Sequence, residues 1–244
     1  MNHFVSSIEL ICLAAEDLGS LLHQFTFVGG STVGLLVTDP QGRSPRLTKD
    51  VDVVIQLSSR TDFYELEQKL RRLGFRNAPE GPIYRFFKEG LVVDVAPTDP
   101  DVIGFSNRWY EVTIQTAEAR ILPNGISINL ITPACFLATK LEAFSSIHHR
   151  DHDDMLASGD FEDIVLLLDG RPSIVADVLA ADAAVITYLR LRFETLLQEP
   201  YLDEAIEAHL DFDKFGRVAL TLERINGIVD GAPTTDRDRR LGAD

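Results

Sequence analysis

The amino-acid sequence changes character at Thr132-Pro133, and this change constrains the fold more than any other feature. Before it, short alternating apolar stretches separated by glycine and proline turns predict strands with a few helices. After it, apolar residues recur every three or four positions, which predicts one helix after another. Thr is a good N-cap and Pro suits the first helical turn. We therefore predict an α/β core over residues 1–131, a helical domain over residues 132–229 and a flexible polar tail over residues 230–244.

Hydrophobic periodicity also locates the individual elements. In the first half it predicts helices over residues 3–23, 31–37 and 61–73. It predicts strands over residues 25–28, 50–57, 83–88, 91–96, 110–115 and 126–131, with turns at 89–90 and 123–125. In the second half it predicts helices over residues 133–147, 160–168, 173–180, 182–198, 201–209 and 213–229.

Composition excludes several classes of protein. The chain has 244 residues, 45% of them apolar and 25% charged, which is typical of a globular protein. No run approaches the roughly 18 apolar residues of a membrane span, and the N-terminus lacks the features of a secretory signal. Cys12 and Cys135 cannot form a disulfide framework. We expect a cytoplasmic protein with no membrane partner.

The charge balance is strongly acidic. Lys and Arg number 23 against 38 Asp and Glu, a net charge of −15. Phosphate neutralisation supplies much of the affinity of nucleic-acid binders, so the chain as a whole would repel nucleic acid and any such partner must use a local patch. Residues 69–88 form one locally basic region, which could face RNA or be a solvated helix face. The excess of acids directs attention to carboxylates that could share a metal ion.

Gly29-Gly30-Ser31 lies between a predicted strand and a short helix. Glycines let the backbone approach a phosphate, and a helix N-terminus offers free N–H groups. The segment is a candidate nucleotide-binding turn, although a plain tight turn would have the same sequence.

Three aspartates lie on two predicted strands. Asp50 and Asp52 are two apart, so they point from one face of a strand and can converge on a divalent cation. Asp94 interrupts an apolar strand, where an acid is costly unless it is paired or bound to metal. Beside the first strand it could be a third metal ligand or the base for an incoming hydroxyl. The alternatives are a solvated strand face for the pair and a water-facing edge for Asp94.

The helical half contributes a lysine and two acids. Lys140 borders the apolar stripe of its helix and could reach a phosphate as a point charge. Asp160 and Asp163 share one helix face further along. Asp160 could simply be a capping acid, and a structural Lys140–Asp163 ion pair is an open alternative.

Taken together, the Gly-Gly-Ser turn, the segment 49–52 and the isolated strand acid resemble the DNA polymerase β type nucleotidyltransferase superfamily. The segments 140–144 and 158–164 narrow the resemblance to the AbiEii/AbiGii type IV toxin nucleotidyltransferases and the related MenT toxins. The resemblance spans about residues 25–170. It implies a polymerase β-like α/β (α+β) core with a mixed sheet, followed by a helical C-terminal domain.

The resemblance also implies roles for particular residues. Gly29, Gly30 and Ser31 would hold the phosphates of a nucleoside triphosphate (NTP). Asp50, Asp52 and Asp94 would be catalytic acids that bind Mg²⁺ or Mn²⁺. Lys140 would be catalytic and contact the nucleotide, with Asp160 or Asp163 as the acid that follows it. The enzyme would transfer a nucleoside monophosphate (NMP) to an acceptor hydroxyl, with tRNA as the acceptor that the toxin resemblance implies, and an antitoxin would be its partner.

Other functions stay open from sequence alone. The acceptor could be a small molecule or a protein, which the net charge favours slightly. A non-catalytic nucleotide-binding or protein-interaction module is a further alternative. The stretch His148–Asp154 is rich in metal-ligand residues and could serve a phosphohydrolase, and Arg150 could reach a nucleotide, but a solvated loop is the simpler interpretation.

Overall fold

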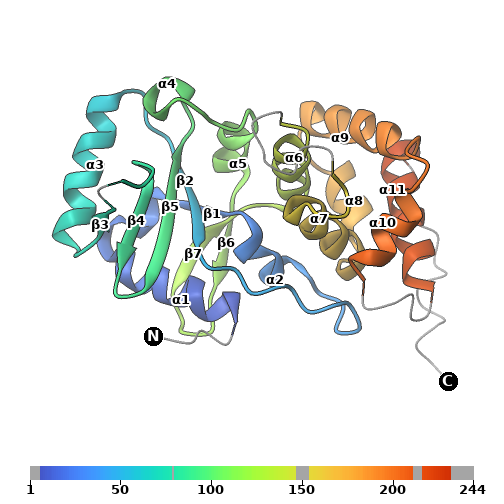
Figure 1. Cartoon of the computed structure of the whole chain (residues 1–244), viewed down its shortest axis with the longest axis horizontal. Helices are drawn as coiled ribbons and strands as arrows, with labels where there is room; N and C mark the ends of the chain where they lie inside the picture. The colour runs from blue at the N-terminus through green and yellow to red at the C-terminus, as the bar shows by residue number, and fades with distance from the viewer. Residues whose placement is uncertain (1–5, 79, 147–153, 211–215, 232–244) are drawn as a thin grey trace. The chain divides into compact units, whose positions relative to one another are not determined.

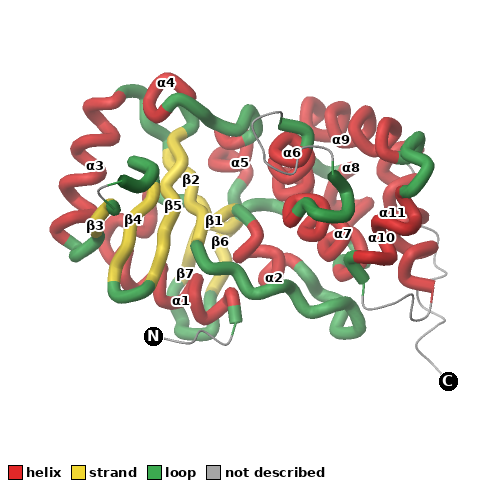
Figure 2. The backbone as a smooth tube through the Cα atoms, in the orientation of Figure 1, coloured by secondary structure: helices red, strands yellow, loops and turns green. Residues whose placement is uncertain are grey.

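The computed structural model describes residues 6–78, 80–146, 154–210 and 216–231 (Figures 1 and 2). The chain divides into two compact units, and each unit combines two chain segments. The first unit is Met1–Leu35 with Arg46–Thr132, and the second is Leu36–Pro45 with Pro133–Asp244. The sequence-based division had assigned residues 36–45 to the first domain. Most of the predicted tail, residues 232–244, lies outside the described residues.

The first unit is built on a seven-stranded sheet with the order β3-β4-β5-β2-β1-β7-β6. β2 pairs parallel with β5 and β1 parallel with β7, whereas the other neighbours are antiparallel. The predicted mixed sheet is therefore confirmed. Its strands are β1 (Thr26–Val28), β2 (Val51–Ile55), β3 (Arg76–Asn77), β4 (Arg85–Lys88), β5 (Leu91–Pro97), β6 (Glu118–Ile121) and β7 (Ser127–Leu130).

Helical segments flank this sheet. α1 begins with a capping box, in which Ser6 and Glu9 satisfy each other's backbone N–H groups. A second favourable N-cap, Ser59, starts α3. The segments are α1 (Ser7–Leu18), η1 (Gly19–Gln24), η2 (Gly30–Thr32), α2 (Val33–Leu36), α3 (Arg60–Arg72), α4 (Pro100–Ile103) and α5 (Tyr110–Thr116).

The two faces of the central strands differ in chemistry. Along β5, buried residues alternate with half-buried ones, as expected for a strand with one covered face. Phe86 lies on the covered face, where its ring contacts Phe63 of α3. Lys88 lies on the same face of β4 and pairs with Asp17 of α1 at 2.7 Å. Helices α1 and α3 therefore cover the apolar face, and Asp94 points from the opposite one.

One predicted strand is wrong. Residues 110–115 alternate apolar and polar, but the segment forms helix α5. The Asn107 side chain accepts the Trp109 N–H at 3.1 Å, and the Thr113 N–H donates to the Trp109 carbonyl at 2.9 Å. Trp109 and Thr113 are buried while Glu111 between them is exposed, which fits a helix face, because in a strand all three would point from the same face. The strand forms instead at β6, whose residues are all exposed and so lack an apolar pattern.

The second unit is helical, as predicted. Its helices bury apolar stripes against one another, and α6 and α7 are buried along most of their length. The helices are α6 (Pro133–Phe144), α7 (Gly159–Gly170), α8 (Ile174–Leu179), α9 (Ala183–Leu196), α10 (Leu202–Ala208) and α11 (Arg217–Asp230).

Residues 36–45 belong to the second unit because they pack on the end of α7. The N–H groups of Thr38 and Asp39 both donate to the Gly170 carbonyl at 2.9 Å. A Cβ on Gly170 would lie 2.6 Å from Val37, so only glycine permits this approach. Near the other end of the segment, Arg43 donates to the His209 carbonyl at 2.7 Å.

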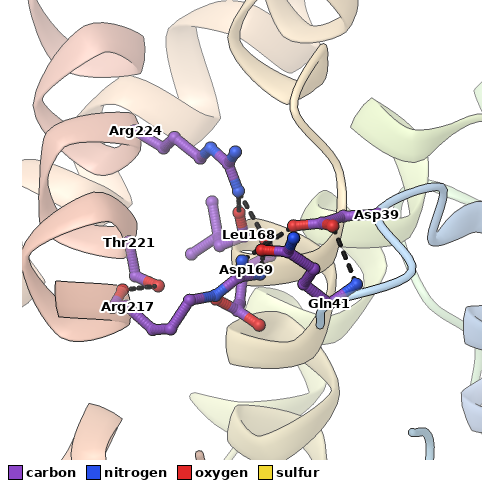
Figure 3. Close-up of polar contacts among 7 residues, drawn as sticks. All are labelled: Asp39, Gln41, Leu168, Asp169, Arg217, Thr221 and Arg224. Carbon is purple, nitrogen blue, oxygen red and sulfur yellow. Dashed lines mark hydrogen bonds and ion pairs between the residues drawn. The ribbon is translucent and has the colours of Figure 1, made fainter. Parts of the chain in front are cut away.

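Two arginines of α11 complete this junction (Figure 3). Arg217 pairs with Asp169 at 2.6 Å and with Asp39 at 2.8 Å. Arg224 is buried and donates to the carbonyls of Leu168 and Asp169 at 2.7 and 2.5 Å. The last carbonyls of a helix have no partner within it, so α11 and the 36–45 segment together satisfy the C-terminus of α7.

Within the described residues, no helix is both long enough and apolar enough to span a membrane.

Candidate active site

Two of the predicted acids, Asp52 and Asp94, lie in one row across the sheet of the first unit. In the sheet register, Val28 of β1 is opposite Asp52 of β2, Asp52 is opposite Asp94 of β5, and Asp94 is opposite Arg85 of β4. Register partners point from the same face of a sheet. The structure therefore brings Asp52 and Asp94 together, although 41 residues separate them in the sequence.

Gly29 lies directly against Asp52. Its φ is 72°, in the region that favours glycine. A Cβ built on Gly29 would lie 2.0 Å from Asp52 Oδ2, far inside van der Waals contact. The Gly-Gly-Ser turn and the first acidic motif therefore form one site, and the absent side chain leaves room for the carboxylate.

Ser31 lies in the turn that follows. It is part of η2 and is fully buried, and its hydroxyl has no hydrogen-bond partner within the described residues. A buried hydroxyl without a partner is unusual, because it has lost its water without compensation. The neighbouring Thr32 hydroxyl, by contrast, donates to the Gly29 carbonyl at 2.8 Å. Ser31 is thus the polar group of this turn that a bound ligand could satisfy.

Arg85 connects the acids. Its Nε and Nη2 donate to the two oxygens of Asp94 at 2.8 and 2.6 Å, a bidentate pair. The same Nη2 donates to Asp50 Oδ2 at 2.9 Å. Asp50 lies just before β2 and reaches the cluster through this contact. All three predicted acids therefore belong to one cluster, and an arginine that the sequence analysis did not single out lies at its centre.

The electrostatics of the cluster follow from burial and from this arginine. Burial raises the pKa of Asp94, Arg85 lowers it, and the charge of Asp50 raises it again, so the pKa lies above its ordinary value. Burial, and then the charge of Asp94, also raises the pKa of Tyr84, which borders the cluster. The Tyr84 ring meets the half-exposed ring of Phe105 edge to face, with centroids 5.0 Å apart.

The carboxylates have the chemistry of a divalent-cation site but not its arrangement. Within the described part of the chain, no group of three or more His, Cys, Asp or Glu side chains is positioned to hold a metal ion. The Arg85 guanidinium pairs instead with oxygens of both Asp50 and Asp94. The donor set nevertheless fits Mg²⁺ or Mn²⁺, which prefer carboxylate oxygens. The Asp52 carboxylate occupies the space that a side chain on Gly29 would fill.

The predicted residues of the helical half form a second cluster. Lys140 of α6 is buried, and its Nζ lies 2.9 Å from Asp160 and 2.7 Å from Asp163 of α7. Burial works against the charged lysine, but the two carboxylates outweigh it and raise its pKa above the ordinary value. The ion pair with Asp163 that sequence reasoning left open is therefore present. Ser158, not Asp160, caps α7.

Other sequence-based candidates have different outcomes. His148 to Asp153, with Arg150, lie outside the described residues. In the basic region, Arg71 pairs with Glu67 at 2.6 Å and Lys88 with Asp17 at 2.7 Å. These contacts neutralise part of the charge that sequence analysis had considered for RNA.

Arg85 could have been found from the sequence. Its strand joins the strand of Asp94 through the turn at Glu89-Gly90, where both residues have positive φ. A two-residue turn fixes the register of a hairpin. Counting back from that turn places Arg85 opposite Asp94, as observed.

Comparison with known families matches residues 12–218 to the family described as "Nucleotidyl transferase AbiEii toxin, Type IV TA system". The match includes the acidic cluster, the Gly-Gly-Ser turn and the lysine cluster of the helical unit. Comparison with curated proteins gives no match.

Proposed function

The chain belongs to the AbiEii family of nucleotidyl transferase toxins of type IV toxin–antitoxin systems, and on this premise we propose that it transfers an NMP from an NTP to a hydroxyl of tRNA. Both substrates are cytoplasmic, which is the compartment we propose for the enzyme. An antitoxin is the expected protein partner of a member of such a system.

The observation that carries the proposal is the row formed by Asp52 and Asp94 beside Gly29. Two aligned strand acids supply ligands for a cation that would neutralise phosphate charge. The adjacent glycine turn, with its buried hydroxyl, supplies groups that would position the phosphates. Phosphoryl-type transfer needs the phosphates to be positioned and their charge to be neutralised, more than it needs a covalent intermediate.

The proposed roles follow from the chemistry of each group. Gly30 and Ser31 bind the phosphates through backbone N–H groups and the buried hydroxyl. Asp50 and Asp52, with Asp94, are the ligands of Mg²⁺ or Mn²⁺. Such a cation, when bound, neutralises phosphate charge and stabilises in-line displacement.

The bond changes are those of nucleotidyl transfer. The acceptor oxygen forms a bond to the α-phosphorus, the bond from that phosphorus to the bridging oxygen of the β-phosphate breaks, and pyrophosphate leaves. Asp94 orients the acceptor hydroxyl and takes its proton. Lys140 pairs with Asp160 and Asp163 in the helical unit, and we propose it as the lysine that contacts the nucleotide.

The test is a transfer assay with each labelled NTP, Mg²⁺ or Mn²⁺ and total tRNA. Wild-type protein is compared with Asp52→Ala and with Asp203→Ala, which removes an exposed aspartate of α10 as a matched control. Label on tRNA that is lost in Asp52→Ala and kept in Asp203→Ala supports the proposal.

Each other outcome changes the proposal in a defined way. Label on the protein itself, or on an added small molecule, replaces tRNA as the acceptor. Nucleotide binding without transfer to any acceptor indicates a non-catalytic module. Transfer that survives Asp52→Ala contradicts the assignment of the acidic cluster.

A further inference from the structure

We propose that Arg85 holds Asp50 and Asp94 together in the cation-free enzyme, and that it must release both carboxylates before they can take a divalent cation. Arg85 would thus set the cation affinity of the site. This inference rests on the proposed function, because it assumes that these acids bind a cation during nucleotidyl transfer.

The contacts are those of a specific pair. A guanidinium that donates two parallel N–H bonds to one carboxylate forms the strongest common type of side-chain ion pair. Arg85 does so with Asp94 and adds a bond to Asp50. The Asp94 side chain is only 13% exposed, so water competes weakly for its oxygens. The arginine therefore binds the same atoms that a cation would use.

Loss of the Arg85 proton cannot break this ion pair. Guanidinium groups stay charged throughout the physiological range, and the bonds to Asp94 raise the pKa of Arg85 further. A competing cation can release it, because a divalent ion carries twice the charge and prefers the same oxygen ligands. The exchange is therefore a competition between two positive groups.

Arg85 has room to leave. Its side chain is 35% exposed, whereas the neighbouring Phe86 is fully buried and anchors β4 to the core. Rotation of the arginine side chain toward solvent leaves the sheet intact. Asp94 and Asp52 then stay in register on neighbouring strands, and the Asp94 oxygens no longer accept from Arg85.

Pairing of Arg85 with the acids should weaken the binding of a cation to the site. When the binding-competent state is only a fraction of the protein, the apparent dissociation constant rises by the inverse of that fraction. If Arg85 is paired in roughly 90% of molecules, removing it tightens cation binding about tenfold. A lysine retains the charge but cannot form the bidentate pair, so it should give an intermediate affinity.

The first experiment measures binding of Mn²⁺ alone by electron paramagnetic resonance, without nucleotide or RNA. Wild type, Arg85→Lys and Arg85→Gln are compared, with Arg76→Gln as the control. Arg76 is an exposed arginine of β3 in the same sheet, so its removal changes the net charge equally. We expect Mn²⁺ affinity to rise from wild type to Arg85→Lys to Arg85→Gln, and Arg76→Gln to match wild type.

A second measurement uses wild-type protein and does not depend on the folding of any Arg85→Gln preparation. The Nε–H of Arg85 donates to Asp94, so its NMR signal should be protected from solvent exchange. Titration with diamagnetic Mg²⁺ should shift this signal and abolish its protection. Arg85→Lys, which lacks the signal, provides the assignment.

The outcomes separate this inference from the proposed function. Equal Mn²⁺ affinity in wild type and the two Arg85 variants, or an Arg85 signal that Mg²⁺ leaves unchanged, overturns the inference. Neither result affects the proposed function if wild type still labels tRNA and Asp52→Ala does not. Failure of the transfer assay together with the expected Mn²⁺ order would instead leave a cation site regulated by Arg85 and overturn the proposed reaction.

Discussion

Gly29 and Asp52 leave no room for a side chain between them. A methyl group on Gly29 would displace the Asp52 carboxylate, since the two would lie 2.0 Å apart. A displacement of about 1 Å in a catalytic group can cost roughly 100-fold in rate. We therefore expect Gly29→Ala to lower nucleotidyl transfer by about this factor, measured as the initial rate of labelling.

The control for this variant is Gly125→Ala. Gly125 has a φ of 83° and no atom within 4 Å of an added Cβ, so it carries the same backbone penalty without the collision. Both variants should lose some thermal stability, but Gly125→Ala should keep its activity. Equal activity in the two variants would show that the Gly29 contact does not matter to the reaction.

Removal of Lys140 should damage stability, because this lysine is buried and paired with two carboxylates. Asp163 beside it is fully buried, and removing one partner of a buried ion pair costs about 3–5 kcal/mol because the remaining charge is uncompensated. We expect Lys140→Met to lower the free energy of unfolding in urea by about this amount. The double variant Lys140→Met/Asp163→Leu should recover part of the loss. A Lys140→Met protein as stable as wild type would contradict the structural role of the pair.

At the level of elements, the segment 36–45 illustrates what the sequence does and does not reveal. Its two prolines and its one glycine are typical of a loop, which is what the segment forms after α2. Nothing in its composition indicates that it packs on α7, because that contact depends on Gly170 and on Arg217, both more than 120 residues away. Local periodicity predicts elements, whereas long-range pairing is a property of the folded chain.

The pH dependence of stability should reveal the anchoring of this segment. Burial raises the pKa of Asp39, but the Gln41 N–H and Arg217 outweigh burial, so the pKa lies below its ordinary value. A depressed carboxyl pKa contributes stability above the ordinary pKa, and that contribution is lost as the pH falls through the folded-state value. Asp39 should therefore stabilise the protein at neutral pH and not in strong acid.

The variant Asp39→Asn tests this expectation. It should lower the free energy of unfolding at about pH 6 by about 1.5–3 kcal/mol, the usual value for a hydrogen bond to a charged group. At about pH 3 the difference from wild type should shrink, because the wild-type carboxyl is then losing its charge. Glu207→Gln, on the exposed side of α10, serves as the control. A deficit in Asp39→Asn that stays constant with pH would argue against the ion pair.

Over the whole molecule, the sequence predicted the division into a mixed α/β half and a helical half, and it predicted the three acids of the cluster. Alternation along each strand assigns Asp52 and Asp94 to the face opposite the buried apolar residues. Parallel pairing of the two strands then aligns the two acids. The sequence could not predict that α5 is a helix, because burial of Trp109 outweighs the β propensity of that segment. Arg85, by contrast, was within reach of the sequence, because the two-residue turn at 89–90 fixes a register that places it opposite Asp94.

The net charge of −15 leads to a prediction about tRNA that belongs to the whole molecule. A protein that neutralises 6–10 phosphates loses about 10³–10⁵ in affinity between roughly 50 and 200 mM salt, because each contact releases counterions. Here Arg71, Arg85 and Lys88 of the basic region pair with acids of the chain, which leaves three of its six basic side chains, Lys69, Arg72 and Arg76, for phosphates. Recognition of tRNA should therefore depend mainly on contacts other than phosphate neutralisation.

We expect the KM for tRNA to rise by no more than about tenfold over that salt range, which corresponds to about two phosphate contacts. Initial rates of labelling at several KCl concentrations measure it. The KM for the NTP, determined over the same range, controls for salt effects on the nucleotide site. A rise of about a thousandfold or more would mean that an extensive basic surface binds the RNA. In that case the charges would be unevenly distributed over the surface despite the acidic net charge, with the basic groups gathered where the acceptor binds.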